Sequence, residues 1–279
     1  MTHTETAAPA DEAAPAFRED WDRWHRARED ASLSPYGTAS LVATNWLAGP
    51  AAPQPEAPGL WHAEGGRVVG SGLGDVPLAA PGAEPERRDV WELAPGDQLT
   101  DGTRRFVAFA RQDQLALRVH DPASATRAAV TRIATWEPDP AWALTGRFVP
   151  ASDGETVAVT TIDGVTGPAP VAGVVELALP TGHDVRLTVT RGPRGLSAVF
   201  GDATNGEESY RFRFVGVGLS EEDGTALVDL NRAFLPPCSF SDHYICPFPV
   251  PGNRWDAPVR AGERAVVLRD GHESITGIH

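Results

Sequence analysis

The sequence contains no lysine, so all 24 of its basic residues are arginine. This absence excludes mechanisms that need a lysine amine, such as a Schiff base, a pyridoxal-phosphate anchor or the lysine of a phosphate-binding loop. Acidic residues number 38, which gives a formal net charge of −14 at pH 7. A large nucleic-acid footprint needs basic side chains that displace counterions. We therefore expect no nucleic-acid partner.

Cysteines are also scarce, and long apolar runs are absent. The two cysteines, Cys238 and Cys246, are too few for a disulfide-stapled scaffold. No apolar run reaches the length of about 18 residues that indicates a membrane-spanning helix, so no membrane partner is expected. Residues 1–16 lack the basic start and apolar core of an export signal, and their Thr, Ala, Pro and Glu content predicts a disordered tail. The expectation is a cytoplasmic protein with reduced thiols; its oligomeric state stays open.

One amphipathic helix is predicted directly after this tail. Phe17, Trp21 and Trp24 recur at helical spacing, and charged residues fill the positions between them. Ser34-Pro35 marks the end of the pattern, because the residue before a proline avoids the helical conformation. An aromatic stripe of this kind indicates packing against the rest of the fold.

Beyond residue 40 the apolar runs become short and are separated by Gly, Pro and Asp. Apolar and polar residues alternate in Val185–Val189 and Tyr210–Val215. One face of each strand is therefore expected to pack on a core, and the other face to contact solvent. The pattern predicts a mainly β fold, an antiparallel barrel or sandwich, as a single domain over residues 17–270 followed by a tail at 271–279. The expected strands are 40–47, 67–70, 105–110, 115–119, 132–136, 144–149, 156–162, 173–179, 185–190, 196–200, 210–215, 226–230 and 265–268.

The proline-rich loop that holds both cysteines is a candidate for metal binding. Cys238, His243 and Cys246 offer three ligands in nine residues. Zinc takes four protein ligands, or three and a water, and no second Cys/His pair completes the set. No metal is therefore expected. The two thiols are interpreted either as small buried apolar side chains or as a thiol pair with redox chemistry.

Polar residues near strand ends are the candidates for a ligand site. Asp229 and Asn231 are two positions apart at the end of a predicted strand, so their side chains are expected to share a face. If that face is buried, both groups need hydrogen-bond partners. Asp202 and Tyr210 flank a predicted turn, and such positions commonly line the ligand site of a β-barrel.

Four motifs in the last third of the chain follow one another in order. They span residues 202–210, 228–240, 246–254 and 261–263. Together they resemble the bacterial and archaeal domain-of-unknown-function family sixteen-eighty-four. The resemblance implies a β-rich domain preceded by a helix, and no established reaction. The family's hallmark positions correspond here to Asp202, Thr204, Gly206, Tyr210, Asp229, Asn231, Pro236, Pro237, Cys238, Cys246, Pro247, Asn253 and Glu263.

These motifs support the hypothesis of one polar small-molecule site. Catalytic roles are assigned to Asp229, as acid or base, and to Glu263. The expected ligand-binding residues are Asp202, Tyr210, Asn231, Asn253 and Arg254. Two alternatives stay open: a non-catalytic ligand-binding or structural protein, and a flavin-binding split-barrel protein whose arginines grip the phosphate. The sequence itself requires no cofactor.

Overall fold

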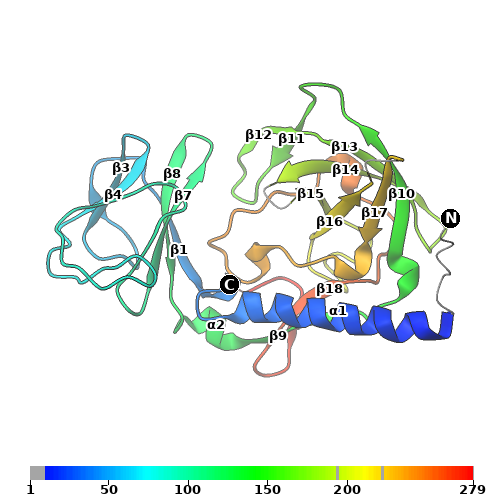
Figure 1. Cartoon of the computed structure of the whole chain (residues 1–279), viewed down its shortest axis with the longest axis horizontal. Helices are drawn as coiled ribbons and strands as arrows, with labels where there is room; N and C mark the ends of the chain where they lie inside the picture. The colour runs from blue at the N-terminus through cyan, green and yellow to red at the C-terminus, as the bar shows by residue number, and fades with distance from the viewer. Residues whose placement is uncertain (1–9, 193–194, 221–222, 279) are drawn as a thin grey trace, which may run out of the picture. The chain divides into compact units, whose positions relative to one another are not determined.

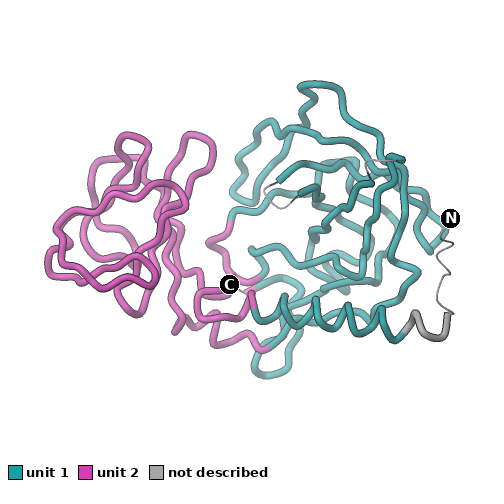
Figure 2. Tube along the Cα trace, viewed as in Figure 1, with its two compact units in different colours: residues 1–30, 132–239, 245–277 teal, residues 31–131, 240–244, 278–279 magenta. Residues whose placement is uncertain are grey.

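The computed structural model describes residues 10–192, 195–220 and 223–278. These residues form two compact units (Figure 2). Unit 1 comprises residues 1–30, 132–239 and 245–277, and unit 2 comprises residues 31–131, 240–244 and 278–279. The single domain expected over residues 17–270 is thus divided between two units, and its folding as one cooperative domain stays a prediction.

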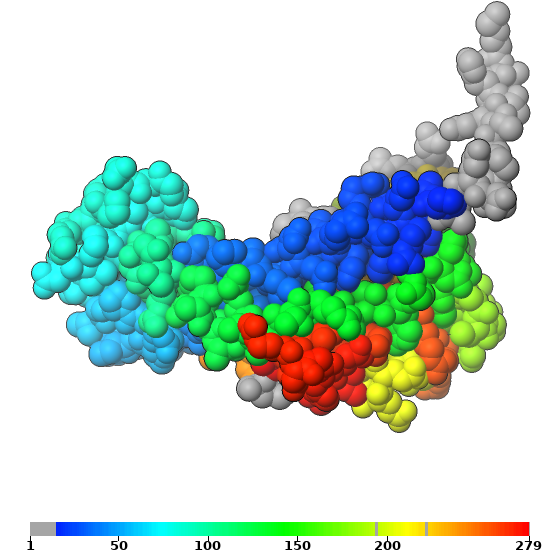
Figure 3. All heavy atoms as spheres, turned by 90° about the horizontal axis from the view of Figure 1, so that it is seen from below, coloured from blue at the N-terminus to red at the C-terminus, as the bar shows by residue number. Residues whose placement is uncertain are grey.

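The N-terminal helix is confirmed as α1 (Ala10–Leu33). Trp21 is buried, and its indole N–H donates to the main-chain oxygen of Asn231 at 2.9 Å, while Phe17 and Trp24 are half-buried. Figure 3 shows α1, in blue, lying along the surface beside later segments of the chain. The helix starts earlier than expected, so residues 10–16 are helical and only 1–9 of the predicted tail lie outside the described residues. Neither described helix is long and apolar enough to cross a membrane.

A closed six-stranded antiparallel barrel forms the body of unit 1 (Figure 1). Its strands, in order round the barrel, are β10 (Ala143–Pro150), β13 (Gly173–Ala178), β14 (Asp184–Gly192), β15 (Gly195–Phe200), β16 (Arg213–Leu219) and β17 (Thr225–Asp229). Closure occurs because β10 pairs with both β13 and β17. Inward side chains such as Val175, Leu187 and Phe200 fill the interior, so the predicted mainly β barrel is confirmed.

Further strands of unit 1 lie outside the barrel. The hairpin β11 (Thr156–Thr160) and β12 (Thr166–Pro170) forms a two-stranded sheet. A three-stranded sheet contains β9 (Val130–Thr135), β18 (Glu263–Leu268) and β19 (Glu273–Ser274), so part of the expected C-terminal tail is a strand. Sequence patterns missed β12 because it reads Thr-Gly-Pro-Ala-Pro, and prolines are unusual in strands except at edges.

Unit 2 contains two four-stranded sheets around one apolar core, which includes Trp61 and Phe106. The first sheet, in order, is β1 (Leu41–Trp46), β8 (Gln114–His120), β7 (Arg105–Arg111) and β6 (Gln98–Thr100). The second is β2 (Ala52–Pro53), β3 (Leu60–Glu64), β4 (Arg67–Ser71) and β5 (Trp91–Leu93). The short helix α2 (Ala125–Ala129) also belongs to unit 2 and begins at the capping hydroxyl of Ser124.

Candidate functional site

Asp202 is part of a buried ion pair. The guanidinium of Arg213 donates to Asp202 Oδ2 at 2.7 Å, and both side chains are fully buried. Asp202 Oδ1 accepts from the backbone N–H of Thr204 and of Val259, while Arg213 also donates to the carbonyl of Val259. Both charges are thus compensated by groups of the protein itself. This carboxylate fixes the 259–263 segment to the barrel rather than facing a ligand space.

Arg213 departs from the alternation predicted for residues 210–215. Phe212 and Arg213 are adjacent, yet both are completely buried. Strand β16 starts only at Arg213, so the residues before it do not follow the strict two-residue period of a strand. A buried arginine is tolerated here because Asp202 and main-chain carbonyls accept hydrogen bonds from both of its terminal nitrogens.

Asn231 and Asp229 are hydrogen-bonded to each other, although Asn231 lies in the 3₁₀ turn after β17 and not on the strand itself. The Asn231 amide donates to Asp229 Oδ1 at 3.0 Å and to the Asp139 carbonyl at 2.9 Å, and it accepts from the Asp139 N–H at 2.9 Å. Asp229 caps the 3₁₀ turn Leu230–Arg232 and pairs with Arg232. The Asn231 amide is therefore occupied in pinning two turns of the chain to each other.

Asn253 makes a similar connection elsewhere in unit 1. Its Oδ1 accepts from the Thr188 N–H at 2.7 Å, and its Nδ2 donates to the carbonyls of Thr188 and Val199 at 2.9 Å each. The amide thus joins β14 and β15 to the loop that carries it. The neighbouring Arg254 has an exposed side chain, and its backbone pairs with Gly201.

Glu263 is a fully buried carboxyl at the start of β18. Its Oε2 accepts from the Leu235 N–H at 2.7 Å, and its Oε1 lies 3.3 Å from Nε of Arg28 on α1. Burial raises the pKa of Glu263 to about 7, and this effect outweighs the opposing influences of Arg28 and the Leu235 N–H. A carboxyl with this pKa changes charge near neutral pH.

Tyr210 and the two cysteines form a third group. The Tyr210 hydroxyl lies within hydrogen-bond distance of two acceptors on Cys238, the carbonyl at 3.3 Å and Sγ at 3.5 Å, and the Cys238 N–H donates to Cys246 Sγ at 3.4 Å. Hydrogen bonds from Cys246 and Tyr210 lower the pKa of Cys238 despite its burial. Burial and the neighbouring Cys238 raise the pKa of Tyr210, which keeps the phenol protonated as a donor. Neither cysteine is in a disulfide.

A cavity of about 270 Å³ lies between the β11–β12 hairpin, β14, β15 and the loop after Cys246. Most of its lining is apolar, and Thr188, Thr190, Arg191 and Asn253 are the polar residues that reach it. The complete lining is Val157, Val159, Ala169, Pro170, Thr188, Thr190, Arg191, Ala198, Val199, Pro247, Phe248, Val250 and Asn253. Asn253 is thus the one residue of the predicted polar site in the lining.

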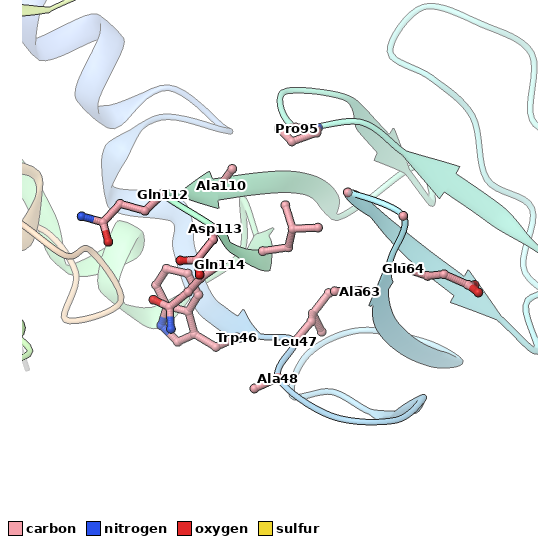
Figure 4. A pocket seen from close by; sticks show the side chains of 13 residues that line it. Trp46, Leu47, Ala48, Ala63, Glu64, Pro95, Ala110, Gln112, Asp113 and Gln114 are labelled. Atoms are coloured by element: carbon pink, nitrogen blue, oxygen red, sulfur yellow. The ribbon is translucent and has the colours of Figure 1, made fainter.

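A larger pocket of about 460 Å³ lies in unit 2 (Figure 4). Trp46 forms part of its wall, and hairpin residues such as Gln112, Asp113 and Gln114 surround it. Arg111 lies over the Trp46 ring at 4.5 Å, so one face of this aromatic is covered. The pocket contains no residue predicted from the sequence motifs.

Side chains that could bind a metal ion do not cluster in the described part of the chain. No group of three or more His, Cys, Asp or Glu side chains within residues 10–192, 195–220 and 223–278 is arranged to hold a metal ion.

Residues 128–264 match the model of a family described as "Protein of unknown function (DUF1684)". The predicted family resemblance is confirmed. The DUF1684 match contains all six barrel strands and every predicted site residue. The solution NMR structure of an uncharacterized protein from gene locus rrnAC0354 of Haloarcula marismortui is 25% identical, with a TM-score of 0.39 over 48% of this chain and 76% of that one. A search of curated proteins found no match.

The DUF1684 motif residues form several hydrogen-bonded groups in the structure. Asp229 joins Asn231, and Tyr210 joins Cys238, whose backbone N–H in turn donates to Cys246 Sγ. Sequence reasoning missed Arg213 and the role of Arg28 as the partner of Glu263. For Arg213, the one available signal was a basic residue between two phenylalanines in a strand that otherwise supplies core.

Proposed function

We propose that this protein binds a small, largely apolar molecule that carries one anionic group, in the 270 Å³ cavity beside the barrel. The observation that carries the proposal is an apolar lining with one arginine at it. Ligand sites typically combine apolar walls with a few polar groups that orient the ligand. The volume lies just below the usual range of about 300–1,000 Å³ for such sites, which favours a short ligand.

The polar groups of the cavity suggest how the ligand is oriented. The Asn253 amide already makes three hydrogen bonds to β14 and β15, so it shapes the wall. Arg191, at the end of β14, is exposed, and no acidic side chain among the described residues pairs with it. Its guanidinium is the cation that would bind a carboxylate, and Thr190 lies one residue before it on the same strand.

This proposal replaces the expected polar ligand with a mainly apolar one, because nine of the thirteen lining residues are Val, Ala, Pro or Phe. Acid–base catalysis at Asp229 and Glu263 receives less support. Asp229 serves as a helix cap, and Glu263 faces Arg28 and Leu235. Neither residue lines the cavity. A bound flavin is tested more simply by the visible absorbance of the purified protein.

The experiment measures binding of octanoate and of octanol by titration calorimetry. We expect octanoate to bind at one site, octanol to bind more weakly, and R191Q to weaken octanoate alone. Val159→Trp should abolish binding because it fills the cavity. Val165→Trp is the matched control, since Val165 is exposed and outside the lining. The proposal is contradicted if octanoate still binds to the Val159→Trp variant. It is also contradicted if the folded wild type does not bind octanoate.

A further inference from the structure

Cys238 and Cys246 lie outside the proposed ligand cavity, in unit 1, on either side of a short segment that belongs to unit 2. The chain leaves unit 1 after Ser239 and returns to it at Ile245. Residues 240–244 belong to unit 2, where the Ser241 hydroxyl donates to the Leu41 carbonyl and the Thr44 hydroxyl donates to the His243 carbonyl. The two cysteines therefore stand directly before and after this excursion.

We propose that Cys238 and Cys246 are a peroxide-reactive dithiol that closes to an intrachain disulfide at the base of the 240–244 excursion. The Cys246 sulfur already accepts a hydrogen bond from the backbone N–H of Cys238 at 3.4 Å. Cys246 Sγ thus lies beside the residue to which it would bond. Cys238 lies in the 3₁₀ turn Pro237–Ser239, which fixes its backbone.

A hydrogen-bond chain distinguishes Cys238 from an inert buried thiol. The exposed Arg211 donates from Nε to the Tyr210 oxygen at 3.3 Å, and the single Tyr210 hydroxyl proton has two acceptors on Cys238, the carbonyl at 3.3 Å and Sγ at 3.5 Å. Donors of this kind stabilise a thiolate, which is the nucleophilic form of cysteine. The lowered pKa of Cys238, caused first by the hydrogen bond with Cys246 and then by Tyr210, agrees with this arrangement.

The reaction takes two steps, with hydrogen peroxide as the oxidant. The Cys238 thiolate attacks one peroxide oxygen, so that an S–O bond forms, the O–O bond breaks, and the departing hydroxide takes a proton to become water. The Cys246 sulfur then attacks the sulfenic sulfur of Cys238, an S–S bond forms, the S–O bond breaks, and the leaving hydroxide takes the Cys246 proton. The two thiols lose two electrons and two protons, and one peroxide becomes two waters.

The roles of the two thiols are tested by mass spectrometry on the full-length folded protein treated with hydrogen peroxide. Wild type is expected to lose two hydrogen atoms and to yield a peptide cross-linked between residues 238 and 246. C246S is expected to stop at a sulfenic acid on Cys238, which dimedone traps. C238S is expected to leave Cys246 unmodified. Peptide mapping separates these products from oxidation of the single methionine, Met1.

Because both thiols are buried, at 1% and 3% exposure, the same reaction is run in urea. Thiols that react only after unfolding overturn the proposal, as does primary attack at Cys246 in wild type. Y210F tests the positioning role of Tyr210: the pH at which Cys238 reactivity reaches half its maximum should rise, while circular dichroism stays native. An unchanged pH profile in folded Y210F removes Tyr210 from the mechanism, and an unreactive Cys238 in every folded variant rejects the dithiol.

Discussion

The guanidinium of Arg213 lies 2.7 Å from the carboxylate of Asp202, and neither side chain reaches solvent. Arg213 also lies 4.9 Å from the Trp136 ring and 5.1 Å from the Phe200 ring, where its charge faces aromatic surfaces. A buried pair of this kind connects the turn after β15 to the first residue of β16 and to the 259–263 segment. Its first role is thus to hold three separate parts of unit 1 in place.

Removing one partner of this pair should be strongly destabilising. D202N leaves the Arg213 charge buried without its counterion, and we expect the free energy of unfolding to fall by about 3–5 kcal/mol. Urea denaturation followed by tryptophan fluorescence measures the change. R260Q is the control, because Arg260 pairs with Glu208 at the surface and its loss should change little. Equal effects of D202N and R260Q would contradict the structural role of the buried pair.

Local patterns predicted the barrel strands better than they predicted the site. The alternation of apolar and polar residues in β14 can be recognised from a few neighbouring residues, because strand geometry places every second side chain on the same face. The burial of Arg213 depends on Asp202, eleven positions earlier, and on carbonyls some fifty positions later. No short window of sequence contains that information. The helix α1 was likewise visible from its aromatic spacing, but the pairing of Arg28 with Glu263 was not.

The cavity was beyond sequence reasoning for the same reason. Its walls come from the β11–β12 hairpin, from β14 and β15, and from the loop at 247–253, so the lining residues extend from Val157 to Asn253 along the chain. The motif residue Asn253 predicted a polar contact, and the structure assigns that contact to main-chain groups of Thr188 and Val199. The sequence shows that an amide needs partners, whereas only the fold shows that the partners are backbone.

Glu263 gives unit 1 a pH dependence with a defined sign. Its pKa is raised by burial to about 7 from an ordinary value of 4.5, so the folded state binds the proton more tightly than the unfolded chain. The contribution of this proton to the free energy of unfolding is fully present below pH 4.5 and is lost as the pH rises to about 7. This contribution amounts to about 3 kcal/mol. His25, whose pKa burial lowers, contributes a slope of the opposite sign.

E263Q isolates the Glu263 contribution. Glutamine keeps the shape and an acceptor for the Leu235 N–H but does not titrate. The difference in unfolding free energy between wild type and E263Q should therefore vary between pH 4.5 and 7, with wild type losing stability relative to the variant as the pH rises. Thermal or urea unfolding at several pH values gives this difference. A pH-independent difference would show that Glu263 does not titrate in this range.

Two glycines of the barrel provide a matched test of its packing. A Cβ added at Gly146 in β10 would lie 2.4 Å from the Glu176 carbonyl and 2.7 Å from Leu177, whereas one added at Gly216 in β16 meets nothing within 4 Å. We expect G146A to cost about 1–3 kcal/mol because the neighbouring strand must move. G216A should be neutral or slightly stabilising, since it reduces the freedom of the unfolded chain. Calorimetric unfolding compares the two, and a greater loss for G216A would contradict the barrel register.

Asn231 and Asn253 are buried amides whose comparison separates a structural role from a role in ligand binding. Each makes three hydrogen bonds through its side chain. Truncation to alanine leaves buried main-chain groups without a partner, so N231A and N253A should each lower the free energy of unfolding by about 2–4 kcal/mol. Only Asn253 lines the cavity. Octanoate affinity, measured at a temperature where both variants are folded, should therefore fall for N253A and stay at the wild-type value for N231A. A loss of affinity in N231A alone would instead return the ligand site to the Asp229 and Asn231 group.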